Sequence, residues 1–126
     1  MPRSPVTVVL GAGRRVRRSA ADALASAGFT VAAECPDLDT TLAAVARHHP
    51  DVCILDRDLP GGGLAAIAAI AAPGRQPKVI VVGGGETPAE VRAARLAGAA
   101  DCLPGAIDTD QLTAAVTRHT RRSDTE

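Results

Sequence analysis

Short apolar runs alternate along the chain with longer segments in which apolar residues recur every three or four positions. The short runs are rich in Val and Ile, and such nearly continuous apolar runs are typical of strands buried on both faces of a parallel sheet. The longer segments have the period of amphipathic helices. The predicted strands cover residues 6–10, 29–33, 52–55, 79–82 and 101–103, and the predicted helices cover residues 14–27, 38–49, 64–72, 88–97 and 108–119.

Several of the predicted helix ends carry residues suited to them. Asp37 and Thr87 precede helical segments, and their side-chain oxygens can accept hydrogen bonds from first-turn amides. Pro88 follows Thr87 at the first helical position, where a missing amide hydrogen costs nothing. Gly28 and Gly98 directly follow two of the helices, as is common at helix C-termini.

Five alternating strand–helix units predict a parallel sheet with right-handed crossovers and helices on both faces. We expect a doubly wound α/β fold of five parallel strands. Ligands of such folds bind at the carboxyl ends of the strands. The 126 residues support one domain, which we assign to residues 1–119, with 120–126 as a polar tail or truncated linker.

Composition excludes several classes of function. Fourteen basic and fourteen acidic residues balance, and Phe29 is the only aromatic residue, so we expect no direct nucleic-acid binding by this domain. No apolar run approaches the ~20 residues of a membrane span, and no signal peptide opens the chain, so we expect a cytoplasmic protein away from membranes. The three cysteines lie far apart in sequence and lack zinc-ligand spacing, which predicts buried thiols.

The most informative residue is Asp56, which follows the third predicted strand. Such an aspartate can simply start a turn. However, residues 50–61, PDVCILDRDLPG, resemble the phosphoacceptor segment of bacterial response-regulator receiver domains, the CheY-like superfamily. The likeness extends along the chain and is greatest to receivers of the NarL/FixJ type. It is carried by GFTV at 28–31, KVIVV at 78–82, AGAAD at 97–101 and Val16-Arg17.

This resemblance implies a flavodoxin-like fold with its five strands in the order 2-1-3-4-5. It also implies phosphoryl transfer to Asp56, supported by an acidic pair that holds Mg²⁺, a Thr or Ser with a small neighbour, and a Lys. The cations are needed because two unit charges ~4 Å apart repel by about 4 kcal/mol at an effective dielectric constant of 20. The chain departs from the pattern at every position except Asp56. The acidic pair falls on Gly11 and Ala12, the Thr or Ser and its neighbour on Gly83 and Gly84, and the Lys on Gly105, or on Pro104 if the loop shifts.

These departures predict an atypical receiver rather than an enzyme. We expect it to act in two-component-type signalling or transcription regulation through protein–protein contact, largely independent of Asp56 phosphorylation. No cofactor is expected, and Mg²⁺ would bind weakly at most, with Asp58 as the one additional carboxylate nearby. Arg14 and Arg15, beside the vacated acidic pair, are predicted to pair with Asp56 in place of a metal ion. Cys102 takes the position of the aromatic switch residue that the resemblance implies.

The expected partners are a second copy of the chain, a histidine kinase or small-molecule ligand, and a C-terminal DNA-binding domain in the full-length protein. Three alternatives stay open. The first is small-molecule sensing in the glycine-rich crevice, and the second is weak phosphorylation at Asp56. The third is dinucleotide binding through Gly11-Ala12-Gly13 and Glu34, although Val16 stands where the fingerprint needs its third glycine.

Overall fold

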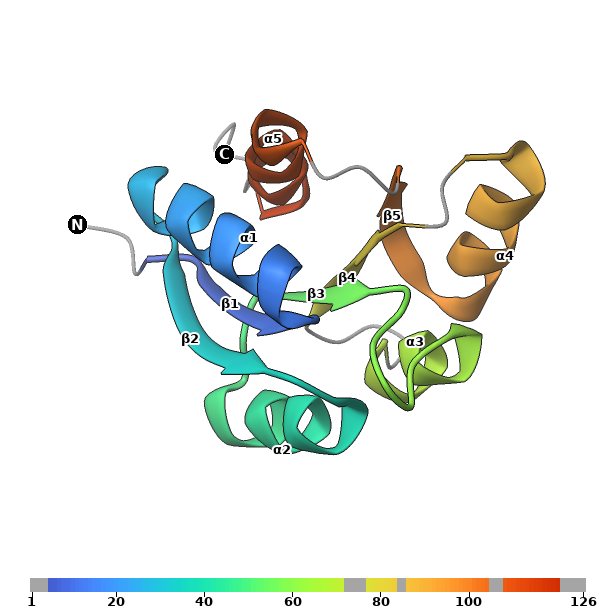
Figure 1. Ribbon diagram of the computed structural model, residues 1–126, viewed down its shortest axis with the longest axis horizontal. Coiled ribbons are helices and arrows are strands. Elements are labelled where there is room, and N and C mark those ends of the chain that lie inside the picture. Colours follow the sequence, from blue (N-terminus) through green and yellow to red (C-terminus); the bar gives the residue numbers. More distant parts are fainter. Residues whose placement is uncertain (1–4, 72–76, 84–85, 105–107, 121–126) are drawn as a thin grey trace, which may run out of the picture.

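The computed structural model describes residues 5–71, 77–83, 86–104 and 108–120. Strands and helices alternate along them, and the strands form one parallel sheet in the order β2-β1-β3-β4-β5, which confirms the predicted fold (Figure 1). The strands are β1 (Thr7–Gly11), β2 (Thr30–Cys35), β3 (Val52–Asp56), β4 (Lys78–Val82) and β5 (Ala99–Leu103). The helices are α1 (Arg14–Ser26), α2 (Leu38–His48), α3 (Leu64–Ile70), α4 (Pro88–Ala97) and α5 (Thr109–Thr120).

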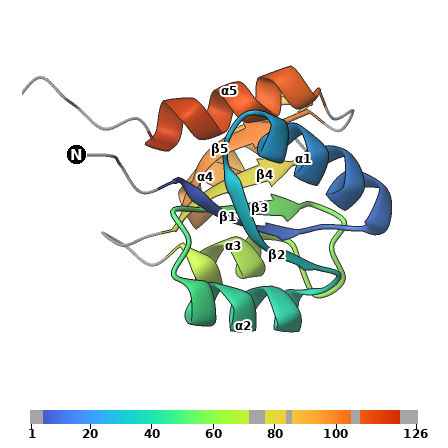
Figure 2. The ribbon, with the colours of Figure 1, turned by 90° about the vertical axis from the view of Figure 1, so that its left-hand side faces the viewer.

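Helices cover both faces of the sheet, which explains why its central strands are apolar throughout. α1 and α5 lie on one face, and α2, α3 and α4 lie on the other (Figures 1 and 2). Along β1, Val8 and Leu10 point into the core beneath α1 and α5, and Val9 points into the core on the opposite face. All three side chains are fully buried. Because both faces exclude water, polar side chains can reach solvent mainly at the ends of the strands.

The predicted helix caps are present. Asp37 accepts a hydrogen bond from the amide of Thr40 at 2.9 Å, and Thr87 forms a reciprocal capping box with Glu90. Gly98 ends α4 with φ of +118°, and a Cβ there would lie 2.8 Å from Cβ of Ala71, so this position needs glycine for both conformation and space.

Most boundaries differ by one or two residues from those expected, and two of these differences have a clear cause. β5 begins at Ala99 rather than at residue 101, because Ala99 pairs with Val79 of β4 although an alanine pair shows little strand preference in the sequence. Thr120, assigned above to the polar tail, is the last residue of α5, and its hydroxyl donates to the carbonyl of Val116 at 2.7 Å. Residues 121–126 of that tail lie outside the described residues.

A charged cluster around Asp101 connects β5, at the edge of the sheet, to α4 and α5. The carboxylate of this β5 residue accepts hydrogen bonds from Arg118 at 2.5 Å and from the amide of Cys102 at 2.9 Å, and it lies 3.1 Å from Nε2 of His119. Arg95 of α4 approaches to 3.9 Å. Burial raises the pKa of the Asp101 carboxyl, but the bonds from Arg118 and His119 outweigh it and hold the pKa below its ordinary value.

Replacing Asp101 is expected to destabilise the fold in a pH-dependent way. Because its folded pKa lies below the ordinary value of 3.8, its stabilisation is present above that pH and disappears as pH falls through the folded pKa. Asp101→Asn should lower the free energy of unfolding by about 1 to 2 kcal/mol at neutral pH. Urea unfolding should show that the deficit shrinks in acid. Asp22→Asn, on an exposed part of α1, is the matched control, and a deficit that is the same in acid would contradict the assignment.

Candidate functional site

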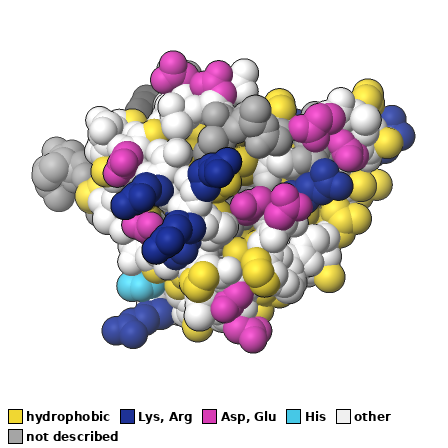
Figure 3. All heavy atoms as spheres, viewed as in Figure 1, with side chains coloured by type: hydrophobic (Ala, Val, Ile, Leu, Met, Phe, Trp, Pro, Cys, Tyr) yellow, Lys and Arg dark blue, Asp and Glu magenta, His cyan; other side chains and the backbone are white. Residues whose placement is uncertain are grey.

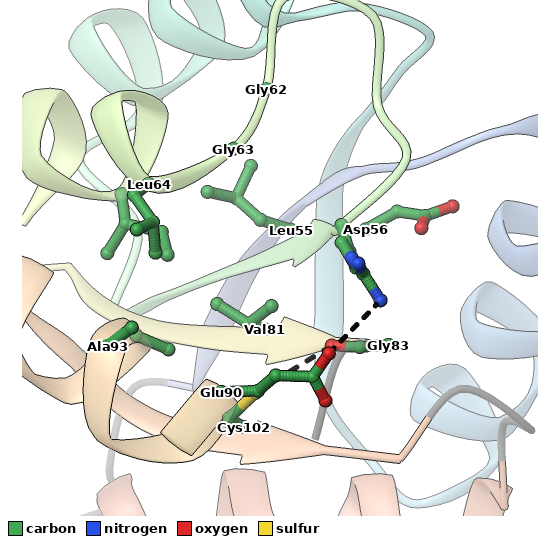
Figure 4. Close-up of a pocket in the computed structure, with 13 residues that line it drawn as sticks. Leu55, Asp56, Gly62, Gly63, Leu64, Val81, Gly83, Glu90, Ala93 and Cys102 are labelled. Carbon is green, nitrogen blue, oxygen red and sulfur yellow. Dashed lines mark hydrogen bonds and ion pairs between the residues drawn. The ribbon is translucent and has the colours of Figure 1, made fainter. Parts of the chain in front are cut away.

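Asp56 is the last residue of β3 and lies half-buried at the carboxyl edge of the sheet. Its Oδ1 accepts the amide hydrogen of Asp58 at 3.0 Å, an Asx-type turn, and its Oδ2 lies 3.4 Å from the amide nitrogen of Gly13, which donates to it. In Figure 4 this carboxylate points away from the neighbouring cavity. The side chain thus both starts a turn and approaches the N-terminus of α1, where the partial positive charge of the helix favours an anion.

The positions expected for the acidic pair are closed by packing. Thr41 of α2 is fully buried beside Gly11, and its hydroxyl donates to the carbonyl of Asp37 at 2.7 Å. A Cβ on Gly11 would lie 2.5 Å from Oγ1 of Thr41, so a side chain there would require that of Thr41 to move. Ala12 is fully buried as well, and its amide donates to the carbonyl of Cys35 at 3.0 Å.

The position expected for Thr or Ser has a backbone that suits neither residue. Gly83 has φ of +93°, and a Cβ there would lie 3.3 Å from Cβ of Arg57. A β-branched threonine is strongly disfavoured at positive φ. The amide of Gly83 donates to the carbonyl of Leu103 at 2.9 Å, which ties this conformation to β5. Gly84 and Gly105, the remaining pocket positions, lie outside the described residues.

The residues at this edge do not fit Mg²⁺. The ion needs several oxygen ligands in near-octahedral geometry, usually including one or two carboxylates. Here the two acidic positions are a glycine and an alanine, and the carboxylate of Asp56 already accepts two backbone amides. Across residues 5–71, 77–83, 86–104 and 108–120, no three acidic, His or Cys side chains gather as metal ligands would.

The expected pairing of Arg14 or Arg15 with Asp56 is wrong. Both arginines are exposed on the first turn of α1, and the ion pairs among the described side chains involve other groups. Figure 3 shows basic side chains grouped on the surface over α1. The reason lies in the helix start: the amide of Gly13 reaches Asp56, whereas the arginines that follow it extend into water.

The geometry also disfavours the dinucleotide alternative. In such sites the pyrophosphate binds to the amides of the glycine loop at the helix N-terminus. Here the amide of Gly13 faces the carboxylate of Asp56, which would repel a bound phosphate. Glu34, the proposed ribose ligand, is exposed on β2.

The three cysteines are buried, as predicted. Burial raises the pKa of the Cys53 thiol to about 12, and the neighbouring Cys35 adds to this effect. Burial also raises the pKa values of Cys35 and Cys102 above the ordinary thiol range. Protonated thiols are poor nucleophiles and metal ligands, so none of them suits such chemistry at neutral pH.

A cavity of about 230 Å³ opens on the other side of Asp56, and Gly62, Gly63 and Gly83 of the glycine-rich crevice are among the residues that line it. It lies between α3 and α4 against β3, β4 and β5, and Figure 4 shows residues that line it. Arg57 and Glu90 form an ion pair at its edge, with 3.8 Å between Nη1 and Oε2. Its walls carry glycines and alanines in place of larger side chains, and the runs of glycine after the third and fourth strands were the signal in the sequence that bears on it.

Comparisons with known proteins agree with this fold. The family described as "Response regulator receiver domain" matches residues 13–117. The signal receiver domain of the response regulator NarL from Mycobacterium tuberculosis is similar in structure, with a TM-score of 0.83 at 28% identity, over 95% of this chain and 100% of that one.

Two more distant structures share the fold. A response regulator from Thermotoga maritima gives a TM-score of 0.82 at 19% identity, over 94% of this chain and 100% of that one. A DNA-binding response regulator of the LuxR family from Staphylococcus aureus gives a TM-score of 0.79 at 18% identity, over 90% of this chain and 98% of that one. No curated protein sequence matches the chain.

Restoring threonine at position 83 is expected to weaken the fold. Gly83→Thr places a β-branched side chain at φ of +93° and should lower the free energy of unfolding by about 1 to 2 kcal/mol. Gly83→Asn, which tolerates positive φ better, is the matched control and should cost less. Denaturant unfolding of the two variants measures the difference, and equal stability of Gly83→Thr and the unmodified protein would contradict the assigned conformation.

The contact between Gly11 and Thr41 can be measured by a double-mutant cycle. Gly11→Ala should destabilise the protein by about 1 to 3 kcal/mol, because its methyl group would overlap the hydroxyl of Thr41. In a Thr41→Ala background, the same substitution should cost clearly less, since the overlapping atom is gone. Additive effects of the two substitutions would show that Thr41 does not close this position.

Proposed function

Because this chain belongs to the response regulator receiver domain family, whose members act in two-component signalling, we propose that it is an atypical receiver that signals by protein–protein contact without depending on phosphorylation of Asp56. The single observation that carries the proposal is the filled edge of the sheet. Thr41 occupies the space beside Gly11, and Gly83 has a backbone conformation unsuited to threonine. Receiver domains are in general signalling domains rather than enzymes, and we assign no catalytic reaction to this one.

The chemistry of phosphoryl transfer supports this proposal. A carboxylate that attacks an anionic phosphoryl group needs nearby cations to offset the repulsion, and receivers generally bind Mg²⁺ for this purpose. Positions 11, 12 and 83 of this chain offer no charge and no side-chain oxygen. Lys78, the only lysine in the sequence, begins β4 and so lies at the opposite end of the strand from Gly83.

The proposal includes partners that fit a receiver of this type. The full-length protein would carry a C-terminal DNA-binding domain, by analogy with the relative from Staphylococcus aureus that is described as DNA-binding. A histidine kinase and a second copy of the chain are further proposed partners. Leu96, which is 83% exposed on α4, favours contact between copies through the α4–α5 side over contact through α1 and α5.

The proposed location is the cytoplasm. No helix in the described parts of the chain has the length and apolar character needed to cross a membrane. The α/β fold with both faces of its sheet covered by helices supports a protein that works in water.

Weak phosphorylation of Asp56 is the second candidate, because the nucleophile itself is present and half-exposed. In this case the carboxylate would have to leave the amides of Gly13 and Asp58.

Intact-mass spectrometry after incubation with acetyl phosphate and Mg²⁺ separates the two candidates. We expect the mass of the unmodified chain to stay constant, since the charges that favour transfer are missing. A receiver that carries the acidic pair, the Thr or Ser and the Lys is the positive control and should gain one phosphoryl group. A stoichiometric gain that Asp56→Asn abolishes would overturn phosphorylation independence and establish the second candidate.

A further inference from the structure

The cavity beside Asp56 has mainly apolar walls. It measures about 230 Å³, and its lining includes Leu64 and Ile67 from α3, Ala93 and Ala94 from α4, and Val81 from β4. In Figure 4, α3 and α4 face each other across the side chains of Leu55 and Val81, and the carboxylate of Asp56 points the other way. Asp56 and Gly83 also line the cavity, so it adjoins the edge where Asp56 approaches Gly13, with the carboxylate directed out of it.

Small side chains leave this volume open. α4 contributes two alanines, β5 contributes Cys102 and the end of β4 contributes Gly83. The chain has no Trp or Tyr, and its one Phe, Phe29, packs against the core on the opposite face of the sheet. Among the described residues that line the cavity, none carries an aromatic ring.

We propose that this cavity binds a small, mainly apolar molecule that contains a single ring or two fused rings. An apolar protein cavity of about 150 Å³ is known to bind benzene, so 230 Å³ leaves space for a second ring or a short substituent. The sulfur of Cys102 lines the wall, and its thiol donates to the carbonyl of Gly83 at 3.7 Å. Polarisable sulfur makes favourable contacts with aromatic rings, which favours a planar ring over a flexible chain.

The polar edge of the cavity limits the ligand further. Arg57 and Glu90 are 56% and 36% exposed, and they pair at 3.8 Å, a separation at which an exposed ion pair contributes little. One polar substituent on the ring could therefore hydrogen-bond to either side chain at small cost. The remaining walls offer mostly carbon, so a ligand with several charged groups, such as a nucleotide, does not fit.

This ligand site goes beyond the proposed function, because it gives the domain a small molecule to respond to. Binding at the site does not require that Asp56 accept a phosphoryl group. A bound ring would contact Ala93 and Ala94 on α4 together with Gly83 at the end of β4. It would therefore stabilise one arrangement of α4 against the sheet.

Titration with indole, a neutral bicyclic ring, tests the proposal on the unmodified chain. Methyl NMR spectra should show saturable shifts at Leu64, Ile67 and Ala94, and thermal unfolding should move to higher temperature as indole is added. Ala93→Leu fills part of the cavity and should weaken indole binding at least tenfold. Ala89→Leu, the same change one turn earlier at an exposed position of α4, should leave affinity within twofold.

Three results would overturn the site. They are the absence of saturable shifts, shifts that map to the opposite core around Leu24 and Val116, and unchanged affinity in Ala93→Leu. If Ala93→Leu does not fold, the methyl shifts of the unmodified protein decide the question alone. The outcome is independent of the phosphodonor experiment, because indole carries no phosphoryl group.

Discussion

Burial of both faces of a parallel sheet is the constraint on which the rest of this structure depends. The central strands place apolar side chains alternately into two cores, so helices must cover both sides. All five strands run in the same direction, and their carboxyl ends therefore meet at one edge. Asp56, Gly11 and Gly83 lie at this edge because each one ends a strand or directly follows one.

The protein stabilises this edge by close packing and backbone hydrogen bonds rather than by charge. Thr41 fills the space beside Gly11, and Gly83 adopts a left-handed conformation that its bond to Leu103 helps to hold. The one remaining carboxylate, that of Asp56, accepts backbone amides at the start of α1. An ordinary receiver would use a metal ion and a lysine to offset the same negative charge, so the family's fold is compatible with a different electrostatic arrangement.

The end of β3 separates two spaces with different chemistry. On one side, the carboxylate of Asp56 lies close to the N-terminus of α1 in a polar, partly solvated setting. On the other side, Leu55 lines a mainly apolar cavity that small side chains on α4 and β5 help to leave open. Because successive residues of a strand point to opposite faces, neighbouring residues can belong to spaces as different as these.

The sequence by itself determined the strands and helices and the positions of Asp56, Gly11 and Gly83 at strand ends, because periodicity and capping are local properties of the chain. The strand order followed from the family resemblance of its motifs. It could not determine what fills the space around these positions. The overlap with Thr41, the conformation of Gly83, the charged cluster of Asp101 and the cavity all involve residues far apart in sequence. The predicted pairing of Arg14 or Arg15 with Asp56 failed for the same reason: proximity along the chain does not set the direction of a side chain, which depends on how α1 docks against the sheet.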